Sequence, residues 1–217
     1  RLYLANNNLD AAAFTFAQDL FGANGVQVLD VSRNRFTTLA DMPTPETRGR
    51  LQSLFLRDVN LTETTLVDLG RWSAVRDLTT LDVRGTPLSS LGPTSEWQAP
   101  QQSDDLNTRP FWKVQSLYVG GRADDRFRWN AFVPTYYMPE LRALDAQFSL
   151  LTGALPSPNV CPALESIDLG EESILNADSG VLDSGWSLVP LLEQSIATSG
   201  VKCPVKYRVI DDSDKSY

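Results

Sequence analysis

The sequence has no histidine, only two cysteines and only two methionines among its 217 residues. Without an imidazole, the chain cannot assemble a Ser-His-Asp or Cys-His catalytic site, a zinc site that uses histidine, or a histidine pH switch. Enzymatic chemistry would have to rely on carboxylates alone, on a Ser-Lys pair or on lysine. We therefore expect a non-enzymatic protein with no catalytic residues, no bound metal and no cofactor.

Basic residues are also few, because 19 Lys and Arg stand against 27 Asp and Glu, for a net charge of -8. Nucleic acids and anionic membranes need a clustered positive surface, so neither is an expected partner. No apolar run approaches the roughly 18 residues of a membrane span, and we expect no direct membrane insertion in this segment. The first residue is Arg1 rather than Met, so we expect a mature form or a fragment.

A short apolar pattern, ideally L-x-x-L-x-L-x-x-N-x-L, recurs along almost the whole chain. Its central apolar anchors are Leu2, Leu29, Leu54, Leu81, Leu117, Leu144 and Ile167. They are separated by 27, 25, 27, 36, 27 and 23 residues. In each L-x-L both anchors point inward and the residue between them points outward, because side chains alternate along a strand. Repeats at such spacing predict a solenoid, in which stacked coils bury the apolar side chains that a single coil would leave exposed.

The asparagine of the pattern normally satisfies backbone groups inside the coil, and here it occurs only as Asn7 and Asn34. The other copies carry substitutes at this position, namely Val59, Thr86, Ser149 and Glu172. Thr86 and Ser149 can still hydrogen-bond to the backbone, whereas Val59 cannot. We therefore expect the internal hydrogen-bond ladder to be interrupted in the middle of the chain.

The pattern resembles the leucine-rich repeat superfamily over residues 1–175. Residues 151–156, LTGALP, are similar to the turn of plant-type extracellular repeats, and residues 72–91 are similar to one repeat of kinetoplastid promastigote surface antigens. The resemblance implies an α/β fold, a leucine-rich repeat solenoid or horseshoe with a parallel concave sheet and short convex helices or 3-10 turns. About seven repeats would be followed by a C-terminal capping region over 176–210 and a polar tail over 211–217.

The segments between the strands differ in composition. Residues 10–20, 62–72 and 185–197 are expected to be helical, whereas 41–50, 92–110 and 133–139 contain proline and are expected to be 3-10 or irregular. The longest step holds an insertion over 89–113 with Trp97, Phe111 and Trp112. This insertion either carries function or folds back over the convex side.

The outward position of each strand should lie on the concave face. It reads Tyr3, Asp30, Phe55, Asp82, Tyr118, Asp145 and Asp168, and the position after the second anchor adds Arg57, Arg84 and Gln147. Tyr and Arg are the residues that most often carry interface energy. The predicted ligand-binding residues are Phe55, Arg57, Asp82, Arg84, Tyr118, Asp145 and Asp168. The alternative is that the aspartates are solvated, as is frequent in such repeats.

Asp145 and Asp168 should lie on adjacent strands about 5 Å apart. Like charges at that spacing destabilise the fold unless a cation or a basic ligand group neutralises them, which favours a protein partner with a basic patch. Two solvated carboxylates that splay apart are the alternative. A glycosidase acid and base is less favoured, since nothing in the pattern supplies a deep pocket.

Cys161 and Cys203 are each followed by proline, and each precedes a predicted terminal strand, 163–169 and 205–210. They suggest a disulfide that closes the cap over about 42 residues and stabilises it by about 3 to 4 kcal/mol, with two buried free thiols as the alternative. Asn60-Leu61-Thr62 is a glycosylation sequon. Together these features favour an extracellular or cell-surface location over an intracellular one.

These observations predict a non-enzymatic protein-recognition module of a secreted or cell-surface leucine-rich repeat protein, with its partner on the concave face. The alternatives are a structural subunit of a large assembly and an intracellular regulatory scaffold. The first coil would expose an unpaired strand edge, so we expect upstream repeats, a cap or a partner to cover it.

Overall fold

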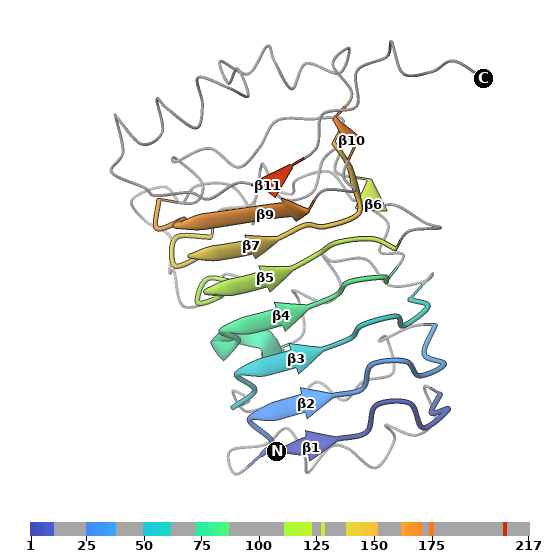
Figure 1. Cartoon of the computed structure of the whole chain (residues 1–217). Coiled ribbons are helices and arrows are strands. Elements are labelled where there is room, and N and C mark those ends of the chain that lie inside the picture. The colour runs from blue at the N-terminus through green and yellow to red at the C-terminus, as the bar shows by residue number, and fades with distance from the viewer. Residues whose placement is uncertain are drawn as a thin grey trace, which may run out of the picture.

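The computed structural model describes residues 1–10, 25–37, 50–61, 73–86, 111–122, 127–128, 138–151, 162–170, 174–175 and 206–207. These residues form one eight-stranded parallel sheet in which the strands follow one another in chain order (Figure 1). Its strands are β1 (Leu2–Tyr3), β2 (Val28–Asp30), β3 (Ser53–Phe55), β4 (Thr80–Asp82), β5 (Ser116–Tyr118), β7 (Ala143–Asp145), β9 (Ser166–Gly170) and β11 (Lys206–Tyr207). We call it the main sheet.

The register of the main sheet follows the apolar anchors. Each central anchor pairs directly with the anchor of the next copy, from Leu2 with Leu29 through to Leu144 with Ile167. From Leu29 to Leu144 these anchors are at most 1% exposed, and the second anchors from Val31 to Ala146 are at most 2% exposed. The predicted strand positions and their register are therefore confirmed.

Helices are few in the described residues, where the 3-10 helix η3 (Ser73–Asp77) is the helical element. The amide of Leu78 donates to the carbonyl of Val75 at 3.1 Å, and the same turn recurs where Val114 donates to Phe111 and Leu141 to Met138. In each case the residue that accepts is buried. The arrangement is compatible with a solenoid-like α/β fold.

A second parallel sheet contains three short strands, β6 (Phe127–Arg128), β8 (Ser149–Leu151) and β10 (Ile174–Leu175), in the order β10-β8-β6. It lies beside the C-terminal ends of β7 and β9, on the side of the main sheet where the arrowheads are (Figure 1). Ser149, one of the expected asparagine substitutes, is the first residue of β8.

Several expectations fall on residues outside the described ranges. They include the helices over 62–72 and 185–197, the helix over 10–20 beyond Asp10, nearly all of the insertion, and the capping region apart from β11. For the two terminal strands, the structure gives β9 as Ser166–Gly170 and β11 as Lys206–Tyr207, and these two strands pair in parallel.

The predicted role of the asparagine is confirmed at Asn34. Its amide nitrogen donates to the carbonyls of Leu4 and Val31, both at 2.8 Å, and its oxygen accepts from the amides of Asn7 and Leu9 at 3.1 and 2.9 Å. One side chain thereby satisfies backbone groups of two neighbouring coils.

The other copies of this position behave differently. The Thr86 hydroxyl donates to the carbonyl of Leu56 at 2.5 Å, which replaces one of the bonds that an asparagine makes. Val59 is fully buried and has no polar group to offer, so the side-chain ladder stops at that coil as expected. Asn7 is exposed and donates to the carbonyl of Ala5 at 3.0 Å.

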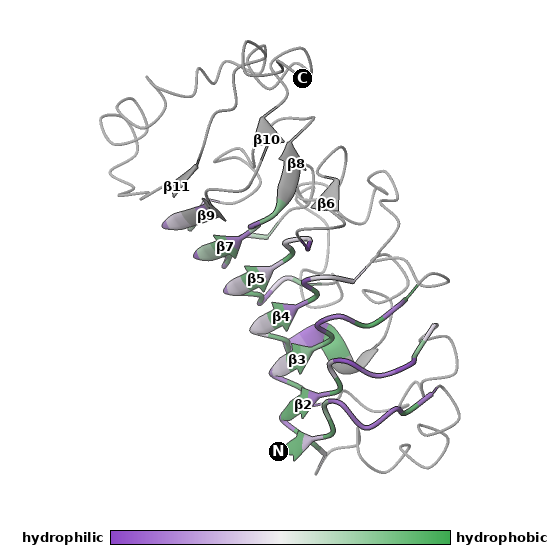
Figure 2. Ribbon diagram, turned by 45° about the vertical axis from the view of Figure 1, so that its right-hand side comes forward, coloured by the Kyte–Doolittle hydropathy of each residue, from purple (hydrophilic) through white to green (hydrophobic). Residues whose placement is uncertain are grey.

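A second regularity lies in the turn after β1, β2, β3, β4 and β7, two residues past the second anchor. The residues there have positive φ angles, and they are Asn6, Arg33, Asp58, Gly85 and Phe148. Gly121, at the same position after β5, does not have a positive φ. From Asn6 to Gly85 each donates its amide to a carbonyl of the next coil at 2.7 to 2.9 Å. The left-handed residue turns the chain out of the strand while it keeps the bond to the neighbouring coil. Figure 2 shows polar residues along the turns after β1, β2 and β3.

We predict that Asn34→Ala lowers the free energy of unfolding by at least about 2 kcal/mol, because several backbone groups lose their partner. Urea unfolding followed by circular dichroism measures the change. Asn7→Ala is the matched control, and it should change stability by less than about 0.5 kcal/mol because its side chain is exposed. Equal effects of the two substitutions would contradict the role given to Asn34.

We predict that Gly85→Ala destabilises the chain by about 1 to 2 kcal/mol. The φ of Gly85 is 66°, and an added Cβ would overlap Oδ1 of Asp58. Arg33→Gly, at the same position of an earlier coil, should stay within about 0.5 kcal/mol of the natural chain, since relief of the left-handed strain offsets the entropy cost of glycine. Thermal unfolding midpoints test both, and an unchanged midpoint for Gly85→Ala would refute the account.

Candidate functional site on the outer face of the main sheet

The outward residues of the main sheet form a continuous row, which we call the outer row. Its members are direct register partners on neighbouring strands: Tyr3, Asp30, Phe55, Asp82, Tyr118, Asp145 and Asp168. A parallel row of small residues lies one position earlier: Ser53, Thr80, Ser116, Ala143 and Ser166. Both rows follow directly from the register of the anchors.

Three aspartates of the outer row share one structural task. Oδ1 of Asp30 accepts the amide of Ser32 at 3.0 Å, and Asp82 and Asp145 accept the amides of Arg84 and Gln147 in the same way, both at 3.2 Å. Each carboxylate thus binds the backbone N–H two residues on, where the strand ends, as short polar side chains commonly do. The sequence signal for this bond is the aspartate that recurs at the end of the strand in the L-D-x-x pattern. This signal is missed when the aspartates are considered only as ligand-binding or solvated groups.

Asp82 is the centre of an ion-pair network. Its side chain is 1% exposed, so its charge needs partners inside the protein. Nε and NH2 of Arg84 donate to Oδ1 and Oδ2 of Asp82 at 3.0 and 2.8 Å, which makes a two-pronged pair. Nε of Arg57 lies 2.9 Å from Oδ2, but its N–H is not directed at an acceptor, so this contact is an ion pair without a hydrogen bond.

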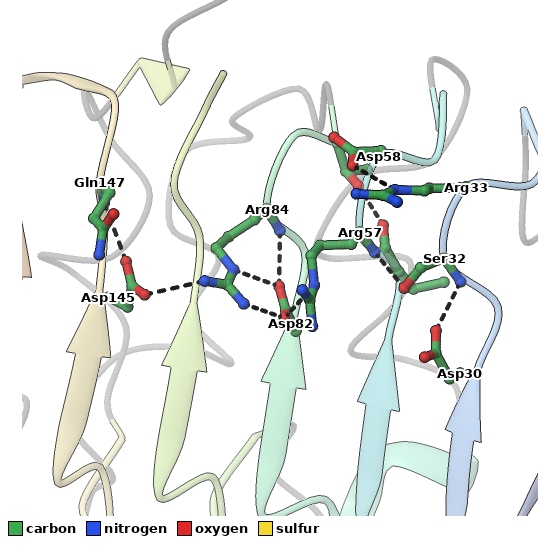
Figure 3. Close-up of polar contacts among 11 residues, drawn as sticks. Asp30, Ser32, Arg33, Arg57, Asp58, Asp82, Arg84, Asp145 and Gln147 are labelled. Carbon is green, nitrogen blue, oxygen red and sulfur yellow. Dashed lines mark hydrogen bonds and ion pairs between the residues drawn. The ribbon is translucent and has the colours of Figure 1, made fainter. Parts of the chain in front are cut away.

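Arg84 also connects strands that are not neighbours. Its NH1 donates to Oδ2 of Asp145 at 3.2 Å, so the side chain of a β4 turn reaches the end of β7 across β5 (Figure 3). On the way its guanidinium lies 4.9 Å from the centre of the Tyr118 ring, a cation–π contact. The equivalent position in the β5 coil is Gly120, where a Cβ would overlap the carbonyl oxygen of Gln147. The glycine therefore lets the β5 coil lie close to the backbone of the β7 coil.

The expected pair of like charges is present, since Asp145 and Asp168 are register partners. Arg84, a residue of this chain, supplies the positive charge that the pattern had assigned to a ligand. Nε2 of Gln147 also donates to Oδ2 of Asp168 at 3.3 Å. A basic group of a partner is therefore not required to stabilise this part of the outer row.

The titration of this network follows from its geometry. Burial raises the pKa of the Asp145 carboxyl, the Gln147 amide and the Arg84 charge lower it, and the charges of Asp168 and Asp82 raise it, so the net pKa lies above its ordinary value. The pKa of Arg84 is raised, first by its hydrogen bond to Asp82. Because the folded chain holds the Asp145 proton more tightly, this group stabilises the fold below its ordinary pKa, and that contribution is lost as the pH rises through the raised pKa.

The remaining predicted site residues have different surroundings. Phe55 is half-buried between Asp30 and Asp82 in the outer row. Asn60 is exposed, while Thr62 of its sequon, Cys161 and Cys203 lie outside the described residues.

No group of three or more Cys, Asp or Glu residues that could hold a metal ion occurs within the described ranges. Within the same described ranges, no helix has the length and apolar character needed to cross a membrane. Comparison with protein-family models, with curated proteins and with solved structures finds no match to this chain.

We predict that two substitutions move the pKa of Asp145 in opposite directions. Asp168→Asn removes a neighbouring negative charge and should lower that pKa, whereas Arg84→Gln removes the positive charge and should raise it. Carbon-13 NMR titration of the aspartate carboxyls measures both shifts directly. Shifts in the same direction would show that the charges around Asp145 are not the ones described.

Proposed function

We propose that this chain is a leucine-rich repeat solenoid, curved as a horseshoe, with the main sheet on its concave side. The support is the in-register pairing of the apolar anchors on successive strands, together with the bonds of Asn34 to two coils and the left-handed turn residue that recurs after β1, β2, β3, β4 and β7. Each is what a stack of similar coils requires, because every coil must bury the same apolar positions and bond to the next.

We further propose that the chain is a non-enzymatic recognition module that binds a protein partner on this concave face. The observation that carries the proposal is the fixed position of Arg84, in the turn after β4, beside Tyr118 of the outer row. Arg84 is held by two carboxylates and by the Tyr118 ring, yet its side chain remains 29% exposed. Its conformational freedom is already lost in the free protein, so a partner that contacts it incurs little further entropy cost.

The chemistry of the outer row fits a protein partner better than a small molecule. Aromatic and arginine side chains are enriched in the energetically important parts of protein interfaces. They are spread over successive strands here and do not converge on one point. An extended, rigid row of this kind suits a broad protein surface.

We place the protein outside the cell or at its surface. Asn60 is exposed in the sequon Asn60-Leu61-Thr62, so the side chain is accessible to a glycan. The even number of cysteines, with their similar local sequences, suits a disulfide in an oxidising compartment.

We predict that a photoreactive p-benzoylphenylalanine in place of Tyr118 forms a discrete covalent adduct with a partner protein in the native source material. The same residue in place of Arg76, which is exposed on η3 outside the outer row, serves as the matched control. Mass spectrometry of the adducts is the measurement. Adducts from position 76 and none from position 118 would contradict the recognition module and favour a structural subunit that contacts its partners through other surfaces.

A further inference from the structure

The first three members of the outer row combine two aromatic rings with a carboxylate. Tyr3, Asp30 and Phe55 are register partners on β1, β2 and β3, so their Cα atoms follow one another at the strand spacing of about 4.8 Å. Tyr3 is 61% exposed, and Asp30 and Phe55 are each half-buried. The carboxylate therefore lies between two aromatic side chains on an accessible face.

Asp30 differs from the other aspartates in the partners of its charge. Its described contact is the amide of Ser32, which Oδ1 accepts at 3.0 Å. Asp82 and Asp145 make the same backbone contact, but each of them also pairs with Arg84. Within the described ranges, no cationic side chain pairs with Asp30.

The arginines of the neighbouring coils are engaged elsewhere. Arg33 pairs with Asp58 at 3.3 Å, and Arg57 is directed to Asp82, away from Asp30 (Figure 3). The hydroxyl of Ser32 accepts the amide of Arg57 at 3.1 Å, so the turn between Asp30 and these arginines is itself held in place. Moving either arginine to Asp30 would break an existing ion pair.

We propose that Tyr3, Asp30 and Phe55 bind one cationic side chain, a lysine or an arginine, of the protein partner. Aromatic faces attract cations through their negative electrostatic potential, and the carboxylate supplies the opposite charge. This rests on the proposed function and deepens it, because it assigns the chemistry of one contact on the concave face. From the sequence, the basic group of the partner is expected to bind near Asp145 and Asp168 on β7 and β9. We place that contact on β1–β3 instead.

Other occupants fit this site less well. An aliphatic or acidic group would cover Asp30 without giving its charge a partner, which is unfavourable. A divalent cation needs several oxygen ligands, whereas the neighbours of Asp30 in the outer row are an aromatic hydrocarbon and a phenol. A monovalent organic cation matches both the charge and the rings.

The test is an NMR titration of the full chain with N-acetyl-lysine methylamide and with N-acetyl-arginine methylamide. N-acetyl-norleucine methylamide, which has the lysine stem without the charge, is the control probe. Both cationic probes should shift the resonances of Tyr3, Asp30 and Phe55, and the norleucine probe should not. Equal shifts with all three probes, or none with the cationic probes, would overturn the proposal.

Substitutions assign the binding to these residues. Asp30→Asn keeps an oxygen for the amide of Ser32 and removes the charge, so the fold is retained while affinity for the cationic probes falls about two- to fivefold. Phe55→Leu should also weaken binding. Asp77→Asn on η3 is the matched control, because it removes one aspartate charge outside the outer row, where Asp77 pairs with Lys113 at 2.6 Å, and it should leave the affinity unchanged. Unchanged affinity in Asp30→Asn would refute the site.

The two proposals can fail separately. Probe binding at Asp30 without an adduct from position 118 would retain the cation site and remove the protein-recognition role of the concave face. An adduct from position 118 without probe binding at Asp30 would retain that role and remove the cation site.

Discussion

Each coil of this chain has to bury two apolar side chains and also satisfy the peptide groups that enter the core with them. Parallel pairing of the strands meets both demands, because it places anchor beside anchor and connects the backbone of each coil to the next. The ladder at Asn34 extends this bonding into the turn. Where Val59 replaces the asparagine, the coil keeps its backbone bonds to its neighbours, and the side chain at this position contributes apolar burial only.

The same constraint arranges the charges of the outer face. Because the anchors are in register, the residues between them are in register too, and aspartates recur at the end of several strands. Each of three carboxylates first binds the backbone of its own turn. What distinguishes them is the second partner. Arg84 joins Asp82 to Asp145 across Tyr118, whereas Asp30 lies in register between Tyr3 and Phe55 and is described in contact with the amide of Ser32.

The outer row therefore has two parts with different chemistry. From β4 to β7 its two aspartates, Asp82 and Asp145, are held by Arg84, and Arg57 places a second positive charge beside Asp82. From β1 to β3 it presents two aromatic side chains and one negative charge that a partner can neutralise. A protein that binds across both parts would use the first for shape and the second for charge. The role of binding surface and the role of stabilising network are then compatible within one row.

The sequence alone was sufficient to predict the strands of the main sheet, their order and the identity of the outer row, but not the three strands of the second sheet. That is because the apolar anchors recur at a near-constant step, and a strand turns alternate residues to the same side. It also predicted the roles of Asn34 and Val59, since one side chain carries an amide and the other carries no polar group.

The tertiary structure decided which side chains meet. Arg84 and Asp145 are 61 residues apart in sequence, and they meet because the stacking of the coils places the β4 turn within reach of the end of β7. No local pattern marks Arg33, Asp58 or Phe148 as left-handed residues, because their strain is accepted only where the stacked coils require that turn. Periodicity reports what every coil has in common. The contacts that differ from coil to coil depend on distances and directions that exist only after the coils have stacked.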